Sequence, residues 1–240
     1  VNRSMLDNAL NISGGVDRAI EFEGINYTFG DSIYNIFTGQ ITDMSYLFNG
    51  TFSDPNLFNS NINYWDTGNV INMSHMFDYA TSFNQPLNNW DTSSVITLRG
   101  TFREANFFNQ PLTNWQTSNV EDMVGMFSGA DQFNSSLIGF DTSKVKTMNS
   151  MFAGNCCSGH QFNQPVNHFN TSNVEDMGYM FYRARNFNKS VSNFDTRKVT
   201  NMNRMFRETN YFNYSLSNFD TSNVEDRGFM FYGSSSFNKP

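Results

Sequence analysis

A segment of 25 to 29 residues recurs along this chain. "FNQPLNNWDTSSV" at residues 83–95 returns as "FNQPLTNWQTSNV" at residues 108–120. The copies are aligned on the aromatic residue before the Asp-Thr-Ser motif, at Trp65, Trp90, Trp115, Phe140, Phe169, Phe194 and Phe219, and an earlier, degenerate copy centres on Ile36. A unit of this length cannot bury its own apolar face, so consecutive units must stack on one another.

The composition indicates what fills such a stack. The chain contains 26 Phe and 13 Met among 240 residues, where Leu and Val usually dominate. Two units are four residues longer than the rest, and both carry the extra residues at one place, in "NGTFSDPNLF" (49–58) and "AGNCCSGHQF" (153–162). An insertion that recurs at one phase predicts a loop that leaves one edge of the stack.

The second half of each unit has a helical pattern. In "TSNVEDMVGMF" (117–127), Val120, Met123, Met126 and Phe127 are spaced as the apolar stripe of a short helix. Ser118 precedes Glu121 by three residues, which is the spacing of a capping box at a helix N-terminus. We therefore expect about two helical turns in each unit after the Thr-Ser pair.

The first half of each unit predicts a short strand. Pro86 and Pro111 occupy the same repeat position, and proline has no N–H group to donate within a sheet. The paired strand should therefore be restricted to about Leu87 to Trp90 and the equivalent residues. The sequence thus predicts a repeat solenoid, an α/β coil with one short parallel strand and one short helix per 25-residue turn.

Polar residues also recur in register. An asparagine follows the first phenylalanine of each unit, and we expect these amides to form a buried ladder that satisfies backbone groups. Lys146 should lie between Glu121 and Glu175, and Lys198 between the acidic pairs at Glu175 and Glu225. Alternating charges remove the repulsion between stacked turns, so this pattern indicates a stacking register.

The repeat resembles a known family. The pattern "MFxxAxxFNxPLxNWDTSxVxxM", as in residues 76–98 and 126–148, resembles a repeat of about 26 residues found in bacterial surface proteins and mycoplasma-type lipoproteins. That repeat is itself similar to BspA-like leucine-rich repeats. The resemblance implies a right-handed, leucine-rich-repeat-like coil displayed at a surface for adhesion or protein contacts. It implies no catalytic residues.

The chain divides into two parts. Residues 1–35 lack the repeat, and the alternating "AIEFEGINYTF" at 19–29 predicts an N-terminal cap with a strand. Residues 36–240 are expected to form an eight-turn solenoid with an uncapped C-terminal end. An uncapped end exposes apolar side chains, so we expect either a longer chain or self-association through that end.

Several functional classes are disfavoured. The net charge is −7 and no run of basic residues occurs, which argues against nucleic acid as a partner. No apolar stretch approaches the roughly 20 residues of a transmembrane helix. The acidic pair Glu121–Asp122 recurs in other units, whereas an active site is usually built once, so we predict no enzyme and no catalytic residues.

We predict no metal site. Cys156 and Cys157 are adjacent and His160 follows, but zinc ligands usually stand two to four residues apart, so a vicinal disulfide or ordinary thiols are the expected states. Calcium at the aspartate corner is a weaker alternative, interrupted by Gln116 and Asn170. That aspartate ladder consists of Asp66, Asp91, Asp141, Asp195 and Asp220.

The following threonines raise an ice-binding alternative, because regular threonine arrays on flat solenoids suit ordered water. This ladder consists of Thr67, Thr92, Thr117, Thr142, Thr171, Thr196 and Thr221. It has one threonine per turn, at a corner, whereas ice-binding faces usually carry two on a strand face. The pattern therefore fits a structural corner better.

The sequence predicts a non-enzymatic, extracellular or surface-displayed solenoid for protein–protein or cell-surface adhesion. The alternative is a structural subunit of an extracellular filament or virion surface, assembled by end-on or lateral contacts. Aromatic residues at variable positions are the binding candidates: Phe107, Tyr182, Tyr211, Tyr214 and Tyr232. The glycosylation candidates are the sequons at Asn11, Asn26 and Asn49.

Overall fold

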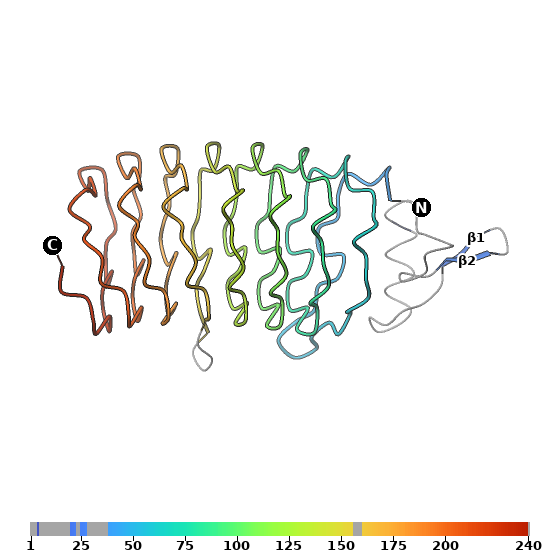
Figure 1. Cartoon of the computed structure of the whole chain (residues 1–240), viewed down its shortest axis with the longest axis horizontal. Coiled ribbons are helices and arrows are strands. Elements are labelled where there is room, and N and C mark those ends of the chain that lie inside the picture. Colours follow the sequence, from blue (N-terminus) through green and yellow to red (C-terminus); the bar gives the residue numbers. More distant parts are fainter. Residues whose placement is uncertain (1–3, 5–19, 23–24, 28–37, 156–159, 240) are drawn as a thin grey trace.

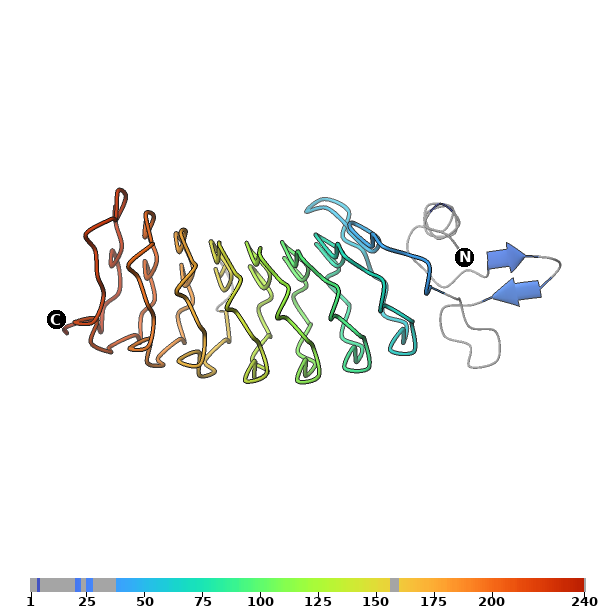
Figure 2. The same ribbon diagram turned by 90° about the horizontal axis from the view of Figure 1, so that it is seen from above.

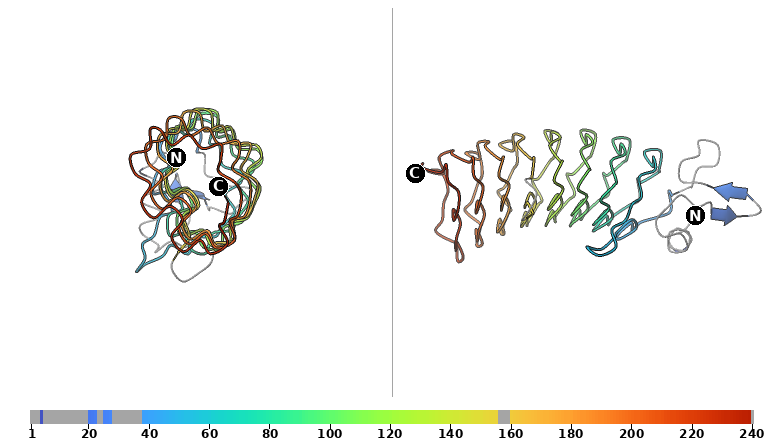
Figure 3. Two further views of the ribbon diagram at one scale, coloured as in Figure 1. Left: turned by 90° about the vertical axis from the view of Figure 1, so that its left-hand side faces the viewer. Right: turned by 90° about the horizontal axis from the view of Figure 1, so that it is seen from below.

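The structure, a computed structural model, describes residues 4, 20–22, 25–27, 38–155 and 160–239. From residue 38 onward the chain winds into similar turns that lie side by side along the long axis of the molecule (Figure 1; Figure 2). Seen along that axis, the turns nearly superimpose (Figure 3). The repeats of the sequence are therefore the units that stack.

Single-residue parallel bridges join neighbouring turns. The bridged residues are Asp43, Asn72, Thr97, Asp122, Thr147, Asp176, Asn201 and Asp226. They are spaced 29, 25, 25, 25, 29, 25 and 25 residues apart, so each repeat returns to the same register whether it is long or short. The four extra residues of the long units do not disturb the stacking.

The prediction of an α/β coil with one helix and one strand per turn is wrong. Residues 38–155 and 160–239 contain neither a helix nor a strand. The strands that the structure describes are β1 (Ile20–Phe22) and β2 (Ile25–Tyr27), which pair antiparallel near the N-terminus. The right-handed, leucine-rich-repeat-like α/β solenoid is therefore not the fold of this chain.

Backbone hydrogen bonding explains why no helix forms after the Thr-Ser pair. Leu98 N–H donates to Asp122 O of the next turn at 2.9 Å, and Gly100 N–H donates to Val124 O at 2.8 Å. Directly after Gly100, Thr101 N–H closes a tight turn onto Leu98 O at 3.2 Å. A helix would direct each N–H to the carbonyl four residues back, but alternate N–H groups here bind the neighbouring turn.

The backbone angles of this segment exclude a helix as well. Gly100 and Glu104 both have φ of 57°, and Gly125 and Gly129 have φ of 60° and 71° one turn later. A left-handed residue ends a helix and suits the third position of a type II turn. Consecutive tight turns also bring every third or fourth residue inward, so they produce the same apolar spacing that predicts a helix.

The segment predicted as a strand is a turn. Trp90 N–H donates to Leu87 O at 3.2 Å, and Trp115 N–H donates to Leu112 O at 3.1 Å one unit later. The parallel bridge instead lies at Thr97, in the segment predicted as a helix. The repeat position of the prolines is thus outside the paired backbone, as their missing N–H group requires.

Two columns of stacked phenylalanine rings form the core. The first column is Phe48, Phe77, Phe102, Phe127, Phe152, Phe181, Phe206 and Phe231, with neighbouring centroids 5.4–5.9 Å apart. The second column is Phe58, Phe83, Phe108, Phe133, Phe162, Phe187, Phe212 and Phe237, at 5.9–6.2 Å. Burying each ring contributes about 1.5–3 kcal/mol, so the columns are a large part of the stabilising interior, together with the buried Met, Val and Trp side chains.

The recurrent asparagines form a ladder along the second column. Asn84 N–H donates to Asn59 Oδ1 at 2.9 Å, and Asn109 N–H donates to Asn84 Oδ1 at 3.0 Å. The pattern continues to Asn238, whose N–H donates to Asn213 Oδ1 at 3.2 Å. The ladder lies at the surface, so the expectation that it is buried is wrong, although it does satisfy backbone groups.

The N-terminal region is described only in part. β1 and β2 form a hairpin with Ile20 opposite Tyr27, where the sequence predicts strand structure at 19–29. Most of the cap predicted for residues 1–35, and Ile36, lie outside the described residues. In the first insertion, Phe52 is 89% exposed and its neighbours are also at the surface, as expected of a loop. Residues 156–159 of the second insertion lie outside the described part.

Within the described ranges, no helix is long and apolar enough to cross a bilayer.

Candidate functional site

Large side chains gather on one face of the last three turns. We call this the arginine–aromatic patch; it consists of Tyr179, Tyr182, Arg183, Arg204, Arg207, Glu208, Phe229 and Tyr232. The residues come from consecutive turns, because positions 179, 204 and 229 are one repeat apart, as are positions 182, 207 and 232.

The backbone presents several of these side chains from left-handed positions. One such position recurs in every turn, at Tyr46, His75, Gly100, Gly125, Ser150, Tyr179, Arg204 and Phe229, with φ between 53° and 60°. Glycine adopts this conformation freely, whereas a bulky L-residue is an outlier there. Large side chains therefore occupy a position that favours glycine in the first two turns, at Tyr46 and His75, and again in the last three turns.

Arg204 occupies the centre of the patch. Its guanidinium carbon lies 5.3 Å from the ring centroid of Tyr179 and 5.5 Å from that of Phe229. It also donates a hydrogen bond from Nη1 to the hydroxyl of Tyr179. The cation is thus held between two aromatic rings of the neighbouring turns, at distances typical of cation–π contacts.

Arg207, three residues after Arg204 in the same turn, also lies between aromatic rings of the neighbouring turns. Its guanidinium lies 4.9 Å from the ring centroid of Tyr232 and 5.8 Å from that of Tyr182. The guanidinium of Arg183 also lies over the ring of Tyr182, at 4.9 Å from its centroid. Glu208 accepts from Arg183 at 2.9 Å and from Arg207 at 3.3 Å. Burial raises the pKa of Glu208, but these two arginines outweigh it and keep the pKa below its usual value.

The patch combines positive charge with exposed aromatic area. Its eight residues carry three guanidinium groups and one carboxylate, in a chain whose net charge is −7. Phe229 is 59% exposed and Tyr232 is 61% exposed, while Tyr179 and Tyr182 are half-buried. Arginine and tyrosine are the residue types that dominate protein-binding hot spots, so this surface can bind an acidic partner.

Of the five binding candidates, the structure brings two together. Tyr182 and Tyr232 lie in the patch, on either side of Arg207. Phe107, Tyr211 and Tyr214 are at other repeat positions and are 62%, 59% and 42% exposed.

The sequence analysis missed the arginines and Phe229. The available signal was the repeat itself, because Arg204 follows Tyr179 by 25 residues and Phe229 follows Arg204 by 25. Residues at one repeat position lie next to each other in a stack, so comparing positions across units would have revealed the alternation of aromatic and cationic side chains.

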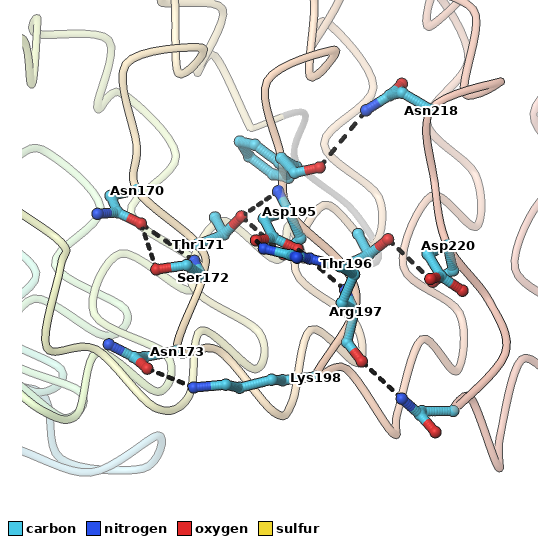
Figure 4. A network of polar contacts seen from close by, with 12 residues as sticks. Asn170, Thr171, Ser172, Asn173, Asp195, Thr196, Arg197, Lys198, Asn218 and Asp220 are labelled. Atoms are coloured by element: carbon cyan, nitrogen blue, oxygen red, sulfur yellow. Dashed lines mark hydrogen bonds and ion pairs between the residues drawn. The ribbon is translucent and has the colours of Figure 1, made fainter.

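The aspartates of the corner ladder serve the backbone. Asp195 Oδ1 accepts from Arg197 N–H at 3.1 Å (Figure 4). Asp220 Oδ1 accepts from Ser222 N–H at 2.9 Å one turn later. The hydrogen bonds and charge of Arg197 lower the pKa of Asp195 to about 2. Among the described residues, no cluster of three or more histidine, cysteine or acidic side chains could hold a metal ion.

The threonine ladder is internal as far as Thr196, whereas Thr221 in the last turn is exposed. Thr171 Oγ1 donates to Asp195 O at 3.0 Å, and Thr196 Oγ1 donates to Asp220 O at 2.9 Å (Figure 4). The hydroxyls of Thr67, Thr92 and Thr117 likewise donate to a backbone carbonyl of the following turn, and these residues are at most 2% exposed. These hydroxyls cannot contact ice, so the ice-binding alternative is wrong.

His160 is a structural residue. It is fully buried, its Nε2 lies 2.9 Å from Phe127 O, and Phe162 N–H donates to its Nδ1 at 3.3 Å. Burial lowers the pKa of His160, so the ring is neutral at physiological pH. Both nitrogens are already engaged with backbone groups, and Cys156 and Cys157 lie outside the described residues.

The charged face follows the predicted register in part. Lys146 Nζ lies 2.6 Å from Glu121 Oε2, and Lys146 N–H and O bond to Glu121 O and Glu175 N–H. Lys198, however, donates to Asn173 Oδ1 at 2.6 Å (Figure 4), and Thr200 occupies the position beside Glu175. The prediction for Lys198 is wrong, because Lys198 stands two residues before the repeat position that lies beside Glu175.

Two of the glycosylation candidates can be located. Asn49 is exposed at the start of the first insertion, and Asn26 lies in β2 opposite Glu21. Asn11 lies outside the described residues.

Residues 19–139 and 155–240 match the family described as "Mycoplasma protein of unknown function, DUF285". The match supports a mycoplasma-type repeat, but it gives no support to a relation with BspA-like leucine-rich repeats. Comparison with curated proteins and with solved structures gives no match. Since the match covers most of its length, this chain belongs to the DUF285 family of mycoplasma proteins of unknown function.

Proposed function

We propose that this chain is a non-enzymatic binding protein, displayed outside the cell or on its surface, which holds an acidic protein partner on the arginine–aromatic patch. The observation that carries the proposal is the gathering of three arginines among aromatic rings over three consecutive turns of an acidic chain. Tyr179, Arg204 and Phe229 stand where glycine would be less strained. Strain of this kind is typical of functional positions.

The composition of the patch supports a protein partner. Arginine and aromatic residues are enriched in protein interfaces, where the rings offer large contact area and the guanidinium offers a planar set of hydrogen-bond donors. The rings of Tyr179 and Phe229 hold Arg204 in place, and Glu208 holds Arg183. Ordered side chains lose less entropy when a partner binds.

Charge supports an acidic partner. Three arginines outnumber the one glutamate of the patch, although the chain as a whole is acidic. A positive patch on a negative protein attracts an acidic surface in one orientation and repels it elsewhere. Adhesion to a protein on another cell is the use that fits the family resemblance.

A peptide-display screen against the intact chain tests the proposal. We expect the selected peptides to be rich in Asp and Glu, and to bind more weakly as salt is raised. The double variant Arg204→Ala, Arg207→Ala should weaken binding about tenfold or more. The matched control is Arg99→Ala with Arg197→Ala, which removes two exposed arginines outside the patch.

Two results would count against the proposal. One is that the selected peptides are not enriched in Asp and Glu; the other is that the control variant loses as much binding as the double variant of the patch. The alternative of a structural subunit predicts self-association of the purified chain. Light scattering over a range of concentrations separates the two, since a binding protein should stay at one mass while a filament subunit should grow.

A further inference from the structure

A shallow groove of about 430 Å³ crosses four consecutive turns near the asparagine ladder. It is lined by Asn134, Gln161, Asn163, Asn186, Asn188 and Tyr211. Five of these six side chains are amides and the sixth is a phenol, so no group in the groove is charged at neutral pH. The groove is therefore built for a neutral, polar ligand.

The ladder fixes the orientation of the amides. Asn163 N–H donates to Asn134 Oδ1 and Asn188 N–H donates to Asn163 Oδ1, both at 2.9 Å. Asn188 Oδ1 in turn accepts from Asn213 N–H at 3.3 Å. Because each amide oxygen is bound to the next turn, each side chain is held in one direction before any ligand arrives.

The same bonds leave a row of free donors. The Nδ2 groups of Asn134, Asn163 and Asn188 have no acceptor within the described part of the chain. One such group stands on each turn, and the phenylalanines that precede these asparagines are 6.0 and 6.2 Å apart. The groove thus offers amide donors at a regular spacing along its length.

An aromatic ring lies at the C-terminal end of the groove, in the column next to this row. Tyr211 belongs to the same repeat position as Gln161 and Asn186, and it is 59% exposed. Asn186 donates from Nδ2 to Gln161 Oε1 at 3.2 Å and to His160 O at 3.4 Å, so it stands between Gln161 and Tyr211 at this repeat position. An exposed phenol offers a flat apolar face and a polar edge.

We propose that this groove binds a chain of neutral pyranose sugars. A sugar hydroxyl has one donor and two acceptor sites, so a row of amide donors can be satisfied by successive hydroxyls. The apolar C–H face of a sugar ring can stack on Tyr211. This site is separate from the arginine–aromatic patch and does not depend on the function proposed for it.

An extended peptide fits the groove less well. Each peptide unit carries a donor as well as an acceptor, and the free amide groups of the ladder can satisfy only its carbonyls. The unpaired N–H groups of the peptide would cost about 1–3 kcal/mol each where they are desolvated.

Isothermal titration calorimetry with the intact chain tests this site. The probes are cellotetraose, maltotetraose, chitotetraose and a released oligomannose glycan, so that a polysaccharide source and a glycoprotein source can be told apart. A neutral Gly-Ser peptide of similar length is the comparison ligand. We expect at least one saccharide to bind with a sub-millimolar Kd and the peptide to show no heat of binding.

Two variants with matched controls locate the binding. Tyr211→Ala should weaken saccharide binding about tenfold, while Tyr214→Ala, which removes another exposed tyrosine outside the groove, should leave it unchanged. Asn163→Ala should also weaken binding. Its control is Asn84→Ala, which removes the same ladder bond in an earlier turn, outside the groove. If the two variants melt at the same temperature and only Asn163→Ala binds the saccharide more weakly, the effect is on binding and not on folding.

Three results would overturn the proposal. The first is that no saccharide binds at millimolar concentration. The second is that binding survives in both Tyr211→Ala and Asn163→Ala. The third is that the neutral peptide binds with the same dependence on Tyr211, which would assign the groove to peptides.

Discussion

The middle turns and the last three turns place very different side chains on the same backbone conformation. Gly100 and Gly125 have φ of 57° and 60°, and Tyr179, Arg204 and Phe229 have φ of 58°, 53° and 56°. Glycine takes this conformation without strain, whereas other L-residues lose roughly 1–2 kcal/mol there. The turn itself therefore gains nothing from the large side chains.

The interior does not change between these regions. Phe102 and Phe127 in the middle turns stack at 5.7 Å, and Phe181 and Phe206 further along stack at 5.5 Å. The interior repeats because every turn must stack on the next, while the left-handed surface positions vary. The difference teaches that the repeating interior carries the stability, and that the surface positions are left to vary, as the contact we propose for the arginine–aromatic patch requires.

The largest expected effect is at a core ring. Phe127→Ala removes a ring at the centre of the first column and should lower the free energy of unfolding by about 3–5 kcal/mol in urea denaturation. Phe229→Ala is the matched control, because that ring is 59% exposed, and it should cost less than about 1 kcal/mol. Equal losses would break the distinction between interior and surface.

A buried ionisable group sharpens the same comparison. The folded-state pKa of His160 lies below its unfolded value, because the ring is buried. Its neutral form stabilises the fold above the unfolded pKa of about 6.5, and this contribution falls as the pH drops below that value. Between pH 7.5 and 5.5 the free energy of unfolding should therefore fall, by at most about 1.4 kcal/mol for this one group.

The pH dependence can be assigned with one variant. His160→Gln has no proton to gain, so its unfolding free energy should fall less over the same range, whatever its stability at pH 7.5. Denaturation curves of both proteins at several pH values measure the difference. Identical slopes would show that His160 is not the group responsible.

The left-handed position itself can be tested in a middle turn. Gly125→Ala should destabilise the chain by about 1 kcal/mol, because a Cβ at φ of 60° is strained although the nearest side-chain atom, Ser128 Cβ, is 3.8 Å away. Ser150→Gly makes the reverse change one turn later and should cost nothing. Thermal denaturation distinguishes these outcomes; a neutral Gly125→Ala would show that the position does not favour glycine.

The smallest effect is expected at the exposed corner. Arg197→Ala should raise the pKa of Asp195 from about 2 toward its usual value of 3.8 in a carboxyl NMR titration. The ion pair stabilises the fold above that usual value and loses its contribution as the pH falls through about 2. Both side chains are largely in solvent, so unfolding at neutral pH should hardly change. An unmoved pKa would exclude Arg197 as the cause.

The sequence predicts the stack but not the path of the chain within each turn. The period of 25 and the two four-residue insertions follow directly from aligned residues, and the parallel bridges keep that register. The error concerns Val120, Met123, Met126 and Phe127, whose spacing suits a helix and a series of tight turns equally. What decides between them is the binding of alternate N–H groups to the next turn, which is a long-range effect.

The candidate site was predictable in part for a similar reason. Tyr182 and Tyr232 can be recognised as exposed aromatics at variable positions. Arg204 cannot be recognised alone, because its role depends on Tyr179 and Phe229, which lie 25 residues away on either side. Only the register of the stack makes them neighbours.

The most direct test of this account is the free energy of unfolding of the triple variant Tyr179→Gly, Arg204→Gly, Phe229→Gly, measured in urea against the unaltered chain. The account predicts a value within about 1 kcal/mol of the unaltered chain, or above it, because relief of the left-handed strain offsets the lost surface contacts. A loss of more than about 2 kcal/mol would show that the patch holds the last three turns together. The patch would then be part of the fold, and the argument that it exists to bind a partner would fail.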